Sequence, residues 1–287
     1  MANAAVAEPA YRTYSGINTY TGPWTDHEVI HLLKRTMFGA KKADVDYFKN
    51  LTMSQAVDEL LNPTAPAPDP PVKEYATSTN ATNPDSGIPQ GTTWINDINN
   101  DGTVQAQRRA SYKKWLTGVM INQDRSIREK LIMLLVDHFG NESADVGNAN
   151  WAYRQHTLIR QYALGNYKNL VRDITTDLMM LRYLNGYLNQ ASAPDENYAR
   201  ELMELYTLGK GPGSGFTESD VKEAAKVLTG WQINGTTWTA VFNANRHSTV
   251  NKTFSSYFNN TVIPGRTGST AGMLELNDLL NMIFAQQ

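Results

Sequence analysis

Apolar residues recur at helical spacing near the start of the chain. The segments 26–39 and 42–61 each carry them three or four positions apart, which predicts two helices. The first helix begins at a capping-box pattern, in which Thr25 and Glu28 each bond to the other's backbone. These two predicted helices form a small helical hairpin.

The helical pattern stops between residues 62 and 103. Five prolines lie between residues 62 and 71, and a stretch rich in Thr, Asn, Ser and Gly follows. Proline fixes φ and lacks a backbone N–H, so a continuous helix or a central strand is excluded here. We interpret residues 62–103 as a long surface connection.

Helical periodicity returns after residue 103. Ser126 and Glu129 form a second capping-box pattern, and the run from Leu131 to Val136 is apolar on every side, which predicts a central position in the core. One predicted helix contains a break near Asp177. The predicted helices cover residues 104–121, 126–138, 149–164, 167–184, 195–208, 219–228 and 273–284.

One segment changes period. In residues 231–242 the helical spacing of apolar residues gives way to a strand-like pattern on either side of Asn234-Gly235. This dipeptide favours the positive φ angles of a two-residue hairpin turn. The sequence therefore predicts a mainly α, multi-helix fold with a small β-hairpin near the C-terminal part. We expect residues 1–61 to hold a lead and the helical hairpin, and to pack as one unit with a main helical domain over residues 104–287.

Composition and charge narrow the classes of partner. The 287-residue chain has a net charge of -2 and a pI of about 6.2, so it lacks the basic surface that holds nucleic acid. No run reaches the roughly 18 apolar residues of a membrane span. Cysteine is absent, which excludes disulfides, thiolate metal sites and a cysteine nucleophile. Abundant Asn, Thr, Tyr and Gly are typical of exported bacterial proteins, so we expect an extracytoplasmic location.

The predicted helix 195–208 carries the most informative polar face. At about 100° per residue, Arg200, Glu201 and Glu204 share one arc with Glu196, while Tyr198, Leu202, Leu205 and Tyr206 lie on the other side. Arg200 is four residues from Glu196 and from Glu204, and Glu201 and Glu204 could share a proton or a cation. The face is either an ordinary salt-bridged surface or the wall of a polar cleft.

Two histidines outside this helix are further candidate functional residues. His138 falls on the apolar face of its own predicted helix. It is either a hydrogen-bonded residue of the core or a metal ligand or general base. His247 lies near Arg246 and Lys252, in either a surface loop or an anion-binding patch. A literal H-E-x-x-H over residues 27–31 lacks a third ligand, and the capping box already explains its glutamate, so we interpret this match as coincidence.

A second candidate site is a calcium loop. Asp97, Asn99, Asp101 and Thr103 place oxygen atoms at alternate positions with Gly102 sixth, as calcium loops require. The twelfth position is Arg108, whereas a complete EF-hand loop has a bidentate glutamate there. The competing interpretation is a turn that caps the helix beginning near Val104.

The run Asp195-Glu196-Asn197-Tyr198-Ala199-Arg200-Glu201-Leu202-Met203-Glu204-Leu205-Tyr206-Thr207-Leu208-Gly209 closely resembles the signature of the bacterial family called domain of unknown function 1800. Blocks at 31–39, 129–139, 163–167, 228–231 and 246–268 agree in order. Asp195 and Ser248 depart from the usual Asn and Asp, and the chain stops where members continue, so the main domain is expected to be incomplete. The resemblance implies an exported helical protein and no particular reaction.

Two functions remain open. The first is a cell-envelope or extracellular binding or scaffold protein with a polar Glu/Arg cleft, whose partner is a cell-surface protein or a polysaccharide. The alternative is an extracytoplasmic metal-assisted hydrolase that uses the Glu201/Glu204 helix with His138 or His247. The only cofactor we expect is calcium, at the 97–103 loop.

Overall fold

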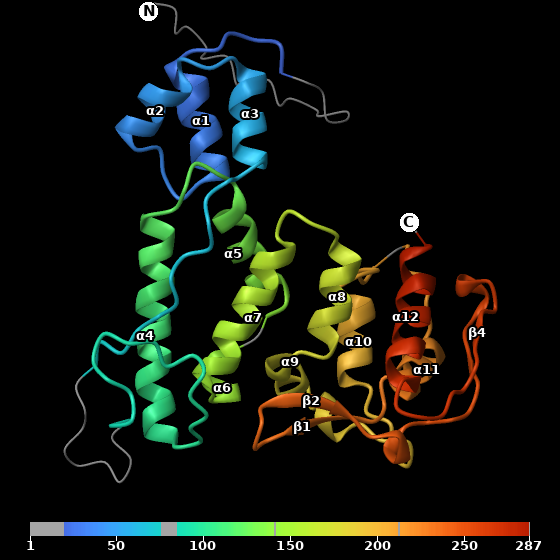
Figure 1. Cartoon of the computed structure of the whole chain (residues 1–287). Helices are drawn as coiled ribbons and strands as arrows, with labels where there is room; N and C mark the ends of the chain where they lie inside the picture. Colours follow the sequence, from blue (N-terminus) through green and yellow to red (C-terminus); the bar gives the residue numbers. More distant parts are fainter. Residues whose placement is uncertain (1–19, 76–84, 141, 212, 287) are drawn as a thin grey trace, which may run out of the picture.

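The chain folds into a row of helices, with two small β-hairpins in the C-terminal part of the chain (Figure 1). The computed structural model describes residues 20–75, 85–140, 142–211 and 213–286. Twelve α-helices and two two-stranded antiparallel sheets occur in these ranges, which confirms the mainly α fold. None of the described helices is long and apolar enough to cross a membrane.

The first three helices form a small group at one end of the molecule (Figure 1). They are α1 (Asp26–Thr36), α2 (Lys42–Phe48) and α3 (Met53–Leu61), and they share their own apolar cluster around Leu33 and Phe48. The capping box of Thr25 and Glu28 is confirmed. The single helix predicted over 42–61 is wrong, because Thr52 forms a capping box with Gln55 and starts α3 afresh.

The connection predicted over residues 62–103 runs alongside α4 (Gly102–Ile121), a long helix at one side of the molecule (Figure 1). Asp101 caps this helix by accepting hydrogen bonds from two backbone N–H groups. Its contacts with the connection are made through side chains, because the backbone groups of the helix are hydrogen-bonded within the helix. The segment 63–72 is named the proline strap below.

The middle of the row contains α5 (Arg128–His138), α6 (Ser143–Val146), α7 (Ala149–Tyr162), α8 (Tyr167–Thr175) and α9 (Leu178–Tyr183). Asp177 caps α9, so the predicted break is confirmed. The capping box at Ser126 is wrong, since the side chain of Glu129 bonds to another helix. Met133 and Leu134 are 48% and 60% exposed, so α5 is not buried on every side.

The C-terminal third carries α10 (Asn197–Glu204), α11 (Glu218–Val227), α12 (Ala271–Phe284) and strands β1 (Trp231–Asn234), β2 (Thr239–Phe242), β3 (Lys252–Thr253) and β4 (Val262–Ile263), with short 3₁₀ turns at Gly186–Leu188, Ala244–Arg246 and Ser256–Phe258. The predicted hairpin is present, but its loop has four residues because Asn234 pairs with Thr239. The Asn234 side chain accepts from two backbone N–H groups inside this loop.

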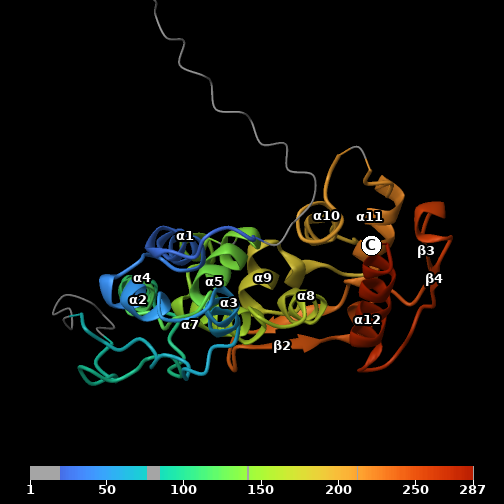
Figure 2. The same cartoon turned by 90° about the horizontal axis from the view of Figure 1, so that it is seen from above.

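The largest apolar core lies among α5, α7, α8 and the C-terminal helices, and includes Phe139, Leu170, Leu202 and Leu279. A second cluster joins Trp94 of the connection to Trp151 and Trp238. Figure 2 shows the helices spread in one extended row, with α4 and α12 toward opposite ends. Helix α7 packs against both α4 and α5, and the proline strap lies beside these three helices.

Candidate functional site

The polar face of α10 forms a charge network centred on Arg200. Its guanidinium lies 3.0 Å from Glu196, 3.4 Å from Glu204 and 2.7 Å from Glu218. Lys210 donates to the other oxygen of Glu204 at 2.8 Å and, with Arg200, holds the pKa of this carboxyl below its usual value. Glu204 therefore bonds to two cations. Glu218 is 71% exposed, so its pair with Arg200 contributes little to stability, whereas the side chain of Glu204 is only 12% exposed.

The predicted two-sided helix is confirmed apart from Leu205, which is 58% exposed because α10 ends at Glu204. Tyr198 and Leu202 are buried, as their side of the pattern predicts.

His138 and His247 occupy environments opposite to those expected. His138 is exposed at the end of α5, and its Nε2 lies 2.7 Å from the hydroxyl of Tyr167. That hydroxyl donates to the carbonyl of Tyr206, so it accepts from His138, which carries its proton on Nε2. His247, in contrast, is 4% exposed, and the surface-loop prediction is wrong for it.

A buried carboxylate explains the position of His247. Glu275 of α12 lies 3.2 Å from its Nε2 and bonds to the ammonium of Lys252 at 2.5 Å. Lys252 also donates to the carbonyl of Ser248. The positive charge of Lys252 is thus paired with the buried carboxylate of Glu275.

The predicted calcium ligands make specific contacts of their own. Arg108, which is fully buried, donates to the carboxylate of Asp97 at 2.5 Å and to its carbonyl at 2.9 Å. Asn99 accepts from the backbone of Asp101, and Asp101 accepts from the backbone of Thr103. The helix-capping interpretation is present in the structure. Calcium binding stays a prediction, which a calcium titration of the wild type and of Asp97→Ala tests.

The predicted site residues therefore belong to separate networks. Arg200 and Glu204 are in direct contact, whereas His138 and His247 have other partners. Within the described ranges, no group of three or more His, Asp or Glu side chains is placed to hold a metal ion.

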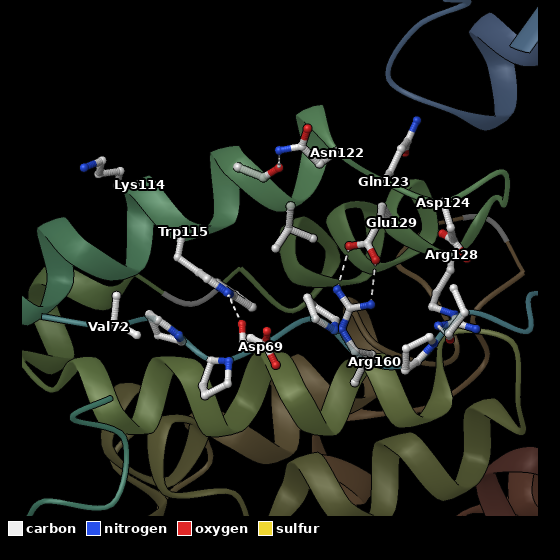
Figure 3. A pocket seen from close by; sticks show the side chains of 18 of the residues that line it. Asp69, Val72, Lys114, Trp115, Asn122, Gln123, Asp124, Arg128, Glu129 and Arg160 are labelled. Carbon is white, nitrogen blue, oxygen red and sulfur yellow. Dashed lines mark hydrogen bonds and ion pairs between the residues drawn. The ribbon is translucent and has the colours of Figure 1, made fainter. Parts of the chain in front are cut away.

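A pocket of about 710 Å³ lies between the proline strap and helices α4, α5 and α7 (Figure 3). It falls within the size range of small-molecule sites, roughly 300–1,000 Å³. Trp115 of α4 projects into it, and Glu129 of α5 points toward Arg160 of α7 (Figure 3). This pocket was not predicted from the sequence.

Side chains from the helices hold the proline strap in place. Arg128 donates to the carbonyls of Pro63 and Ala65, each at 3.1 Å, and the indole N–H of Trp115 donates to the carbonyl of Asp69 at 2.6 Å. Ser111 bonds to the carbonyl of Val72 at 2.8 Å. The strap is thus fixed as one wall of the pocket.

The pocket contains a buried ion pair. Arg160 donates two hydrogen bonds to the two carboxylate oxygens of Glu129, at 2.5 and 2.6 Å. Their side chains are only 9% and 6% exposed. A planar, bidentate pair of this kind is geometrically rigid, so it presents fixed polar edges to the cavity.

One buried acceptor at the edge of the pocket lacks a partner among the described residues. The side-chain oxygen of Gln123 is buried and makes no hydrogen bond to any described residue. Gln123 also lines a neighbouring hollow beside Met37 and Phe38, and its side chain points away from the Glu129–Arg160 pair (Figure 3). The amide of Asn122 donates to the carbonyl of Gly118.

The charges that line the pocket nearly balance. Glu129 pairs with Arg160, and Lys114 with Glu74. The charged lining residues are Lys114, Arg128 and Arg160 on the cationic side, and Asp69, Glu74, Asp124 and Glu129 on the anionic side. The lining thus suits a polar ligand without net charge.

Comparison with known proteins gave one result. The family model described as "Protein of unknown function (DUF1800)" matches residues 31–287. A search of curated proteins and a search of solved structures each returned no match.

Proposed function

Because this chain belongs to the family of unknown function DUF1800, whose description names no reaction, we propose from its pocket that the protein is an exported ligand-binding protein. The binding site is the pocket between the proline strap and helices α4, α5 and α7. Its ligand is a neutral, hydroxyl-rich molecule, an oligosaccharide. The observation that carries the proposal is that this pocket holds an indole ring and a rigid, buried Glu129–Arg160 pair together.

The chemistry of the lining fits such a ligand. The apolar C–H face of a sugar ring packs against an indole, and Trp115 offers part of its ring to the cavity. Sugar hydroxyls both donate and accept hydrogen bonds. They would donate to the carboxylate of Glu129 and accept from the guanidinium of Arg160.

The charge balance argues against an anionic ligand. A phosphate or polyanion site collects unpaired Arg and Lys side chains, because each contributes an attractive charge. Here Arg160 is already neutralised by Glu129, and Lys114 by Glu74. Arg128 uses two of its N–H groups to hold the strap. A neutral ligand does not need to displace these partners.

Export is supported by composition rather than by the pocket. Asn, Thr and Tyr are abundant in the chain. Polysaccharides of the cell surface are the natural source of an oligosaccharide ligand for such a protein. Fractionation of cells that express the full-length protein tests export, and recovery in the cytosol alone would contradict it.

The alternative function, a metal-assisted hydrolase, uses Glu201 and Glu204 with His138 or His247. In it, Glu201→Gln and Glu204→Gln abolish turnover while the fold survives. In the binding proposal, both variants keep wild-type affinity for the oligosaccharide, since neither residue lines the pocket. The two functions are therefore separated by the same pair of variants.

Isothermal titration calorimetry with neutral tetrasaccharides of glucose, xylose and N-acetylglucosamine tests the proposal. We expect at least one to bind, and Trp115→Ala to weaken it by about tenfold through lost ring packing. Trp115→Phe keeps an aromatic face but loses the hydrogen bond to the carbonyl of Asp69. It therefore distinguishes the contribution of ring packing on the sugar from the contribution of the bond that holds the proline strap.

Lys113→Ala is the matched control, because Lys113 is exposed on the same helix and does not line the pocket. It should bind as the wild type does. Inorganic phosphate should not compete. Binding that is unchanged in Trp115→Ala, or competition by phosphate, would overturn the assignment of the pocket.

A further inference from the structure

A second cavity, of about 370 Å³, lies among the same three helices. Glu129 lines both cavities, but the second has a different character because most of its wall is apolar. The apolar lining residues are Leu116 and Met120 of α4 and Ile132, Met133 and Val136 of α5. Its volume is within the range that accommodates a small organic molecule.

His156 of α7 is the unusual polar group in this wall. It is 2% exposed, and neither ring nitrogen makes a hydrogen bond with any described residue. The rings of Tyr112 and Trp115 contact it edge-on, at centroid distances of 6.2 and 5.3 Å. Buried polar groups in proteins are nearly always hydrogen-bonded, so an imidazole with two free nitrogens beside a cavity requires an explanation.

The imidazole is neutral. Burial and the neighbouring charge of Arg160 lower the pKa of His156 to about 3. A neutral imidazole carries one N–H donor and one nitrogen acceptor. The acidic residues in the wall, Glu129 and Asp137, disfavour an anionic ligand.

We propose that this cavity is a ligand site for a small neutral molecule with an apolar body and one hydroxyl group, which bonds to a ring nitrogen of His156. The apolar residues of α4 and α5 surround the body of the ligand, and His156 selects the hydroxyl. The site is separate from the oligosaccharide proposal and does not depend on it.

Phenol and toluene are the probes, since they differ by one hydroxyl group. With methyl-labelled methionines in the full chain, phenol should shift the NMR signals of Met120 and Met133, which line the cavity. Met203 lies in the main core and should not shift. Phenol should also move the ring-nitrogen signals of His156, whereas toluene should not.

His156→Phe tests the role of the hydrogen bond. The wild type should prefer phenol to toluene by about tenfold, as one net hydrogen bond provides. In the variant this preference should disappear while toluene binding persists. Equal affinity of the wild type for both probes, or an unchanged preference in His156→Phe, would overturn the proposal.

Met133→Trp provides a test that does not require a substitution in the core. Met133 is 48% exposed, so an indole can be accommodated at the mouth of the cavity. The variant should keep the wild-type melting temperature and lose the phenol shift at Met120. A retained shift, or phenol shifts confined to Met203, would place the ligand elsewhere and refute the site.

Discussion

Replacing His156 by phenylalanine is expected to make stability less sensitive to acid. The folded protein keeps this imidazole neutral until about pH 3, because burial and Arg160 lower its pKa. In the unfolded chain a histidine binds a proton below about pH 6.5. The unfolded state therefore binds more protons between these values, and the stability of the wild type falls as the pH falls through this window.

The size of the effect follows from the two pKa values. Each pH unit below about 6.5 removes about 1.4 kcal/mol of unfolding free energy, which amounts to about 2 kcal/mol at about pH 5. Phenylalanine carries no proton and removes this loss. At neutral pH the substitution removes two buried, unpartnered nitrogens, which raises the free energy of unfolding by about 1–3 kcal/mol. The larger phenylalanine ring overpacks the core and lowers the free energy of unfolding by about 1–3 kcal/mol, so the two effects oppose each other.

The test is urea unfolding, followed by circular dichroism at about pH 7.5 and about pH 5, for both proteins. The decrease between the two pH values should be about 2 kcal/mol smaller in His156→Phe. His31→Phe, at an exposed position of α1, is the control and should keep the wild-type decrease. Equal decreases in wild type and His156→Phe, or an NMR titration of His156 centred near pH 6.5, would refute the reasoning.

Three further predictions concern other sites in the structure. Arg108→Leu should cost about 3–5 kcal/mol of unfolding free energy, because it leaves the buried carboxylate of Asp85 unpaired; urea unfolding measures this, and a cost below about 1 kcal/mol would contradict it. Burial raises the pKa of Asp177 to about 6, so its contribution to stability falls as pH rises from about 4 to about 6. Asp177→Asn, which can still cap α9, should remove that fall, and an unchanged pH profile would show that the carboxyl titrates normally. Gly265→Ala should lower the melting temperature, because a Cβ there would lie 2.0 Å from a backbone oxygen, whereas Gly235→Ala, in open space, should not.

The sequence predicted features that depend on neighbouring residues. The capping box of Thr25 and Glu28 and the helix break at Asp177 are both confirmed. Each involves hydrogen bonds between groups two or three positions apart, so the pattern itself contains the information. The contact of Arg200 with Glu196 and Glu204 was predictable for the same reason.

Features that depend on distant contacts were missed. Glu129 and Arg160 are 31 positions apart, and the local pattern assigned Glu129 to a capping box instead. The exposure of His138 and the burial of His247 depend on which helices pack against them, which periodicity does not reveal. The pocket itself exists because Trp115 and Arg128 hold the proline strap against α4 and α5.

One signal in the sequence could have pointed to the pocket. Arg128, Glu129 and Arg160 are charged residues in helices that otherwise carry apolar core positions. Such residues are rarely buried without a partner, so they indicate a buried polar network. The sequence does not say which of them meet.

The most direct measurement of the central claim is a crystal structure of the protein with the tetrasaccharide that binds most tightly. We predict a sugar ring packed on Trp115, with its hydroxyl groups bonded to an intact Glu129–Arg160 pair. Density for the sugar along the Arg200 face of α10, with the pocket beside the proline strap unoccupied, would contradict the account.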